Sequence, residues 1–156
     1  DGYCGFISLP RLFQHTQTPW GAPVPYLHAD TAKTQTMAAL LPSGKALRVG
    51  LVWGGAPRNH TLAAHIVDRR RSLPLSALEP LGRLPGVALI SLQKGPYAEQ
   101  VTDPPEDMRL YDPTEALHSM YDTAAQIMGL DVVFSVDTSV AHLAGGLGKP
   151  WLPMAR

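Results

Sequence analysis

The residues best suited to chemistry lie in one short run, where Asp137, Thr138 and Ser139 separate a predicted strand from a predicted helix. A helix that begins directly after a strand exposes unpaired backbone N–H groups, with the positive end of its dipole behind them. Such a helix start is an anion site, and phosphate is its usual ligand. The two hydroxyls add donors, and His142 lies one turn beyond Thr138, so both side chains can face the same ligand.

The same four residues also have an explanation that needs no ligand. Asp, Thr and Ser are common helix caps, each worth about 1 kcal/mol, and Asp137 is the residue that we expect to cap this helix. A single histidine on a helix is more often structural than functional. The run by itself does not decide between a phosphate site and simple capping.

The elements that must position this run are buried strands alternating with helices. The strands are short, apolar and rich in β-branched residues, whereas the helices show apolar residues at three- and four-residue spacing. The predicted strands cover 49–53, 87–92, 108–111, 132–136 and 149–154, and the predicted helices cover 31–41, 74–84, 114–128 and 140–147. This alternation predicts an α/β fold: a Rossmann-like, mainly parallel sheet with flanking helices and right-handed crossovers.

Polar and small residues follow the predicted strands at their carboxyl ends. Gly54 and Gly55 follow the first strand, and Gln93 and Lys94 follow the second. In parallel sheets the ligand binds beyond these strand ends, and glycines there let a ligand or another backbone approach closely. Their convergence with the run after 132–136 is independent support for a site at this edge.

A basic triplet at 69–71 comes just before the predicted 74–84 helix, where the helix dipole disfavours positive charge. One explanation is a solvated run of charges. The other is that Arg71, the residue of the triplet nearest to the helix, holds an anion above the sheet.

Composition restricts the class of protein. The chain has 156 residues, 45 % of them hydrophobic, which suits one domain with a substantial core. Thirteen basic residues balance thirteen acidic ones, which argues against a nucleic-acid binder. The single Cys4 cannot form an internal disulfide, and no apolar run approaches the roughly 18 residues of a membrane span. We therefore expect a soluble, cytoplasmic protein. His60 and His65 do not have convincing metal-ligand spacing, so no metal is predicted.

Residues 1–45 are predicted to be an inter-domain arm and linker helix, and 46–156 a Rossmann-like nucleotide-sugar-binding domain. Four prolines within 1–29 exclude a continuous helix or a central strand, yet this part is too apolar for a free linker. We expect an arm packed across a surface that belongs to another domain. The chain starts abruptly without Met, so we expect it to be a fragment. We also expect the 46–156 domain to be truncated at its C-terminal end.

Several segments together resemble the C-terminal half of bacterial glycosyltransferases. They are, in order, LRVGLVWGGAPRN, DRRRSLPLSALEPL, VALISLQKG and YDTAAQIMGLDVVFSVDTSVAHLAGGLGKPW. The most similar group is the heptosyltransferase-like region (glycosyltransferase family nine) found after tetratricopeptide repeats and often described as O-GlcNAc-transferase-like. The run VDTSVAHLAGGLGKP is the most specific part of this resemblance.

The resemblance implies a GT-B architecture, in which two Rossmann-like domains face each other across a cleft. The C-terminal domain would hold a nucleotide-diphosphate sugar as donor substrate, with no separate cofactor. By this resemblance the donor diphosphate would contact Asp137, Thr138, Ser139, His142 and Arg71, and the nucleoside would contact Gln93 and Lys94.

The resemblance also places the catalytic base in the N-terminal domain, which this chain lacks, so Asp137 is not assigned that role. One departure from the pattern lies ahead of the DTAA run. Relatives often carry an acidic residue and a phenylalanine there, and this chain has Ser119 and Met120. That departure weakens any role assigned around Asp122.

The first hypothesis is therefore the donor-binding half of an inverting glycosyltransferase. The alternative is a non-catalytic nucleotide-sugar-binding or scaffold module attached to repeats. A receiver-type regulatory domain is disfavoured, because it would need an acidic cluster where Gly54 and Gly55 follow the first strand.

Overall fold

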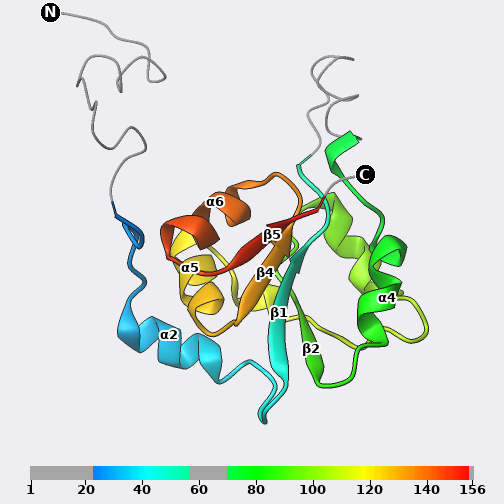
Figure 1. Ribbon diagram of the computed structural model, residues 1–156, viewed down its shortest axis with the longest axis horizontal. Helices are drawn as coiled ribbons and strands as arrows, with labels where there is room; N and C mark the ends of the chain where they lie inside the picture. The colour runs from blue at the N-terminus through cyan, green and yellow to red at the C-terminus, as the bar shows by residue number, and fades with distance from the viewer. Residues whose placement is uncertain (1–22, 57–69, 155–156) are drawn as a thin grey trace, which may run out of the picture.

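The computed structural model describes residues 23–56 and 70–154. Within these ranges five strands form one sheet in the order β3-β2-β1-β4-β5, and every neighbouring pair is parallel (Figure 1). The strands are β1 (Leu47–Val52), β2 (Val87–Ser91), β3 (Leu110–Tyr111), β4 (Val132–Ser135) and β5 (Trp151–Pro153). The predicted α/β fold with a mainly parallel sheet is confirmed.

The central strand β1 pairs with β2 on one side and with β4 on the other. Its register runs from Leu47 opposite Val87 along β2, and from Val49 opposite Val132 along β4. Along the chain, β2 and β3 are added on one side of β1, and β4 and β5 are then added on the other side. In such sheets the ligand crevice lies at the point of reversal, which here is the gap between the carboxyl ends of β1 and β4.

Helices cover both faces of the sheet (Figure 1). On one face lie α2 (Thr31–Ala38), α5 (Met120–Met128) and α6 (Ser139–Gly146), together with the 3₁₀ turn η4 (Thr114–Ala116). On the other face lie the 3₁₀ helix η2 (Leu75–Leu78), α4 (Glu79–Gly82) and the 3₁₀ helix η3 (Pro96–Thr102). None of the helices in the described ranges has the length and apolar character required to cross a membrane.

Alternate residues along β1 pack into the two opposite layers, as the pleat requires. Val49, Leu51 and, just beyond the strand, Trp53 belong to the cluster under η2 and α4. Val52 belongs instead to the cluster beneath α2, α5 and α6. Leu51 and Trp53 are fully buried, so the carboxyl end of β1 is anchored in the core up to the point where the predicted site begins.

The predicted 114–128 helix is wrong as one unit. The structure has η4, then an extended stretch, and only then α5. The break occurs because Ser119 takes an extended conformation (φ −148°) and caps α5, its Oγ accepting from the Asp122 N–H. The amphipathic pattern ran through this cap, so periodicity alone did not reveal it.

Other boundaries differ less. The helix predicted at 31–41 ends at Ala38, and Asp30 caps its start by accepting from the Lys33 N–H at 2.7 Å. The helix predicted at 74–84 is divided into η2 and α4, and η3 lies between the predicted strands at 87–92 and 108–111.

The segment 24–30 precedes α2 without regular secondary structure and contacts the end of α6. The backbone N–H groups of Tyr26 and Leu27 both donate to the Gly146 carbonyl, at 3.0 and 2.9 Å. A Cβ on Gly146 would lie only 2.7 Å from Leu27 Cδ1. The described part of the predicted arm therefore packs on this domain, and residues 1–22 lie outside the described ranges.

Candidate functional site

A cavity of about 250 Å³ lies at the carboxyl ends of the central strands. Its walls come from four places: the segments after β1 and β2 and the first turns of α5 and α6. The lining residues are Val52, Gly54, Gly55, Ala56, Leu92, Gln93, Lys94, Gly95, Met120, Thr123, Thr138, Ser139 and Val140. The cavity occupies the sheet edge at which the sequence predicted a site.

The buried glycines after β1 make room for two side chains. A Cβ on Gly54 would lie 2.2 Å from Cγ of Tyr97, and one on Gly55 would lie 2.7 Å from Cζ of Arg71. The close approach predicted at these glycines is thus occupied by the Tyr97 ring and the Arg71 guanidinium. Tyr97 is not among the residues singled out from the sequence.

Gln93 fixes the segment after β1. It is buried, and its Oε1 accepts from the N–H groups of Trp53 and Gly54 at 2.9 and 2.8 Å. Its Nε2 donates to the carbonyls of Gly54 and Lys94, at 2.8 and 2.7 Å. The sequence predicted that Gln93 contacts the nucleoside. In this structure both polar atoms of its side-chain amide are hydrogen-bonded to the protein backbone, so the side chain shapes the cavity wall.

Lys94 is exposed, and its Nζ donates to the Thr114 carbonyl at 2.9 Å. This hydrogen bond ties the end of β2 to η4. Lys94 also lines the cavity, and the nucleoside contact predicted for it stays a prediction.

The start of α6 corrects one expectation. The N-cap is Thr138, so the prediction that Asp137 caps the helix is wrong. The reason is local: Thr138 Oγ1 hydrogen-bonds Ser135 Oγ at 2.9 Å, which holds Thr138 in an extended conformation at the helix entry. The Thr138 side chain makes no capping hydrogen bond to α6. A helix start that its N-cap side chain does not cap keeps backbone donors available to a ligand.

Asp137 and His142 lie on the surface beside the cavity and do not line it. Both side chains are nearly four-fifths exposed, and Asp137 Oδ1 is 3.7 Å from His142 Nε2. This contact is an ion pair only when the imidazole is protonated. Of the four residues in the predicted run, the structure brings Thr138 and Ser139 into the cavity wall.

Arg71 bridges the two sides of the crevice. Its Nη1 donates to the Asp137 carbonyl at 3.1 Å, and its Nη2 donates to the Ala56 carbonyl at 3.4 Å. The half-buried guanidinium therefore joins the segment after β1 to the segment after β4, directly against Gly55. A positive charge stands at the point where the sheet order reverses.

The wall formed by α5 was missed from the sequence. Met120 and Thr123 line the cavity, because α5 begins at Met120 rather than six residues earlier. The Ser119–Asp122 spacing resembles a capping box, and this signal could have located the helix start.

Larger hollows lie elsewhere in the described ranges. Their volumes are about 610, 580 and 420 Å³, and the first lies between the end of α2 and η4. None of the residues that the sequence singled out lines these three. Across the described ranges, no three His, Cys, Asp or Glu side chains gather closely enough to hold a metal ion. His60 and His65 lie outside these ranges.

Comparisons with known proteins support the fold. No family model and no curated protein sequence matches this chain. Among solved structures, the fold is similar to that of E. coli ADP-heptose LPS heptosyltransferase II, with a TM-score of 0.63 and 12% sequence identity. The match covers 90% of this chain and 43% of the heptosyltransferase chain, so this chain spans less than half of that enzyme's length. At this identity the likeness shows a shared Rossmann-like α/β fold.

Proposed function

We propose that this chain is the donor-binding half of a glycosyltransferase, which transfers a sugar from a nucleotide-diphosphate sugar. The observation that carries the proposal is the cavity at the reversal point of the sheet, bounded by the start of α6 and bordered by Arg71. The fold shared with a heptosyltransferase supports the same reaction class.

The proposed chemistry follows from charge. When the sugar leaves, the nucleoside diphosphate gains negative charge, and fixed donors that face this charge lower the barrier. The N–H groups of α6, the hydroxyls of Thr138 and Ser139 and the Arg71 guanidinium are such donors. His142 would add a donor at the surface, and a protonated imidazole would add a charge.

The size of the cavity indicates how the donor would lie. About 250 Å³ is below the roughly 300–1,000 Å³ of pockets that enclose drug-sized ligands. A nucleotide sugar would therefore extend out of the cavity, past Arg71, toward the surface that carries Asp137 and His142. In this arrangement the nucleoside lies toward Gln93 and Lys94, and the sugar faces a second domain that supplies the catalytic base.

A calorimetric titration tests the binding half of the proposal. The chain is titrated with ADP, UDP, GDP, CDP and dTDP, with the corresponding nucleoside monophosphates, and with inorganic phosphate as a reference. One nucleoside diphosphate should bind more tightly than phosphate and than its own monophosphate. Equal, negligible heats for all ligands would contradict the proposal. Tight binding by a full-length protein that transfers no sugar would instead support the non-catalytic module.

A further inference from the structure

We infer that residues 24–41, called the strap from here on, position both helices that bound the cavity. The strap contacts α5 through the Lys33–Asp122 ion pair, and it contacts α6 through the Gly146 carbonyl. The inference rests on the proposed function in one respect, namely that the positioned cavity binds a nucleoside diphosphate.

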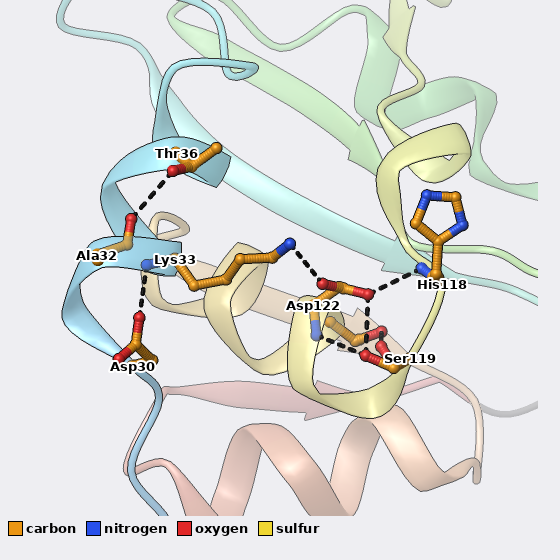
Figure 2. A network of polar contacts seen from close by, with 8 residues as sticks. Asp30, Ala32, Lys33, Thr36, His118, Ser119 and Asp122 are labelled. Carbon is orange, nitrogen blue, oxygen red and sulfur yellow. Dashed lines mark hydrogen bonds and ion pairs between the residues drawn. The ribbon is translucent and has the colours of Figure 1, made fainter.

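The contact with α5 is a nearly buried carboxylate with three partners (Figure 2). The side chain of Asp122 is 8% exposed, and its Oδ1 lies 2.8 Å from Lys33 Nζ of α2. Its Oδ2 accepts from the His118 N–H at 3.0 Å and from the Ser119 hydroxyl at 2.8 Å. A carboxylate withdrawn from water in this way depends on its partners, and removing one is costly.

The same carboxylate is linked to the cavity wall in two short steps. Ser119 Oγ accepts from the Asp122 N–H at 3.2 Å, and the Ser119 carbonyl accepts from the Thr123 hydroxyl at 3.0 Å. Thr123 and Met120 both line the cavity. The first turn of α5 is thus held by reciprocal bonds between Ser119 and Asp122, and Lys33 balances the charge at their centre.

The contact with α6 is at the opposite end of that helix from the cavity. Tyr26 and Leu27 donate to the Gly146 carbonyl, and Leu27 fills the space that a side chain on Gly146 would take. Ser139, at the other end of α6, lines the cavity. Eight helical residues span about 12 Å, so the contact at Gly146 holds the end of α6 about one helix length from the cavity.

The strap is itself anchored in the core. Met37 and Leu41 are 2% and 7% exposed and belong to the cluster beneath the helical layer. The Asp30 cap fixes the first turn of α2, which carries Lys33. One continuous stretch of chain therefore holds two separate walls of the cavity against the same core.

The test separates positioning from mere stability. Hydrogen exchange and nucleoside diphosphate affinity are measured on four proteins: wild type, Lys33→Met, Lys33→Arg and Lys45→Met. Lys33→Met removes the charge and keeps much of the side-chain length, and Lys33→Arg restores the charge. Lys45 is exposed and follows the strap, so Lys45→Met matches the loss of charge as a control.

Lys33→Met should raise amide exchange in 118–124 on the order of 10-fold, with β1 and β2 unchanged, because the opening is local. It should also weaken diphosphate binding on the order of 10-fold. Lys33→Arg should recover most of both effects, and Lys45→Met should show neither.

Two results would overturn the inference. One is unchanged amide exchange in 118–124 of Lys33→Met. The other is faster exchange there with unchanged diphosphate affinity, provided that the wild type binds the diphosphate. If the wild type binds no diphosphate, it is the proposed function that fails. The exchange comparison then decides alone whether the strap fixes α5.

Discussion

Two buried glutamines are in opposite situations. Gln93 has four hydrogen bonds to the backbone around the cavity. Gln126, in the last turn of α5, is 0% exposed, and neither its Oε1 nor its Nε2 has a hydrogen-bond partner in the part of the chain that the structure describes. An unsatisfied buried polar group costs about 1–3 kcal/mol, so the two residues should respond oppositely to the same substitution.

Gln126→Leu should raise the free energy of unfolding by about 1–2 kcal/mol, because it removes two unsatisfied polar atoms at similar volume. Gln93→Leu should lower it by about 2–4 kcal/mol, because the N–H groups of Trp53 and Gly54 lose their acceptor. Urea denaturation followed by circular dichroism measures both. Destabilisation by Gln126→Leu would show that this amide has a partner, such as a buried water.

The two arginines at 70 and 71 provide a matched pair for the anion site. Arg71 is half-buried across the crevice, and Arg70 is exposed. Arg71→Ala should weaken nucleoside diphosphate binding about 10- to 100-fold, since a hydrogen bond to a charged group is worth about 1.5–3 kcal/mol. Arg70→Ala should change the affinity only slightly, and the change should fade with salt. Calorimetry measures both affinities. Equal losses of affinity in the two variants would show that Arg71 acts only through its charge and makes no specific contact with the diphosphate.

The predicted run after β4 makes a similar comparison possible. His142→Ala and Thr138→Ala should each weaken diphosphate binding about 10- to 100-fold if both side chains reach the phosphates. Thr138 also bonds Ser135, so circular dichroism must show an intact fold for that variant. Unchanged affinity in both variants would show that Thr138 and His142 make no contact with the phosphates and have only a structural role at α6.

At the scale of elements, the strands could be predicted and some helix starts could not. The short apolar runs at β1, β2 and β4 are typical of central strands in a sheet that is covered on both faces. Their predicted bounds are within two residues of those observed. The start of α5 depends on Ser119 and Asp122, and Asp122 depends on Lys33, which is distant in sequence. The Ser119–Asp122 spacing is a local signal for this start, but no local pattern contains the pairing of Asp122 with Lys33.

The candidate site followed the same division. Parallel topology alone placed Gly54, Gln93 and Thr138 at one edge, and the structure confirms that they line one cavity. The contacts that these residues make could not be predicted from the sequence. Gln93 hydrogen-bonds the backbone of Gly54, and the absence of a side chain at Gly54 makes room for the Tyr97 ring. Their proposed ligand contacts stay predictions.

The α2–α5 contact should give the protein a specific acid sensitivity. The hydrogen bond from Lys33, followed by that from Ser119, lowers the pKa of Asp122 from 3.8 to about 2. The ionised carboxylate therefore stabilises the fold fully above about pH 4, and this contribution is lost as the pH falls through about 2.

Urea denaturation between pH 5 and pH 2 tests this sensitivity. The free energy of unfolding of the wild type should fall more steeply than that of Asp122→Asn, which has no carboxylate to protonate. Parallel curves for the two proteins would show that Asp122 titrates normally.

At the scale of the whole molecule, the proposed function requires a second domain facing the cavity. Glycosyl transfer requires donor, acceptor and base held together, and this positioning supplies much of the rate enhancement. We expect this chain alone to bind a donor weakly and to show no measurable transfer. The comparison is a transfer and donor-hydrolysis assay on this chain and on a longer chain that adds a second Rossmann-like domain. Equal turnover by both would place the catalytic groups within these residues.

The outer strand β5 has a consequence for how the molecule behaves in solution. Trp151 and Leu152 are 39% and 52% exposed on a strand that pairs with β4 alone among the described strands. An apolar, open strand edge is a template for adding a strand from another molecule. The formal net charge of zero at pH 7 provides no long-range repulsion against such an encounter. The least soluble condition should thus be near neutral pH at high concentration, and light scattering should detect growing particles there before any unfolding occurs.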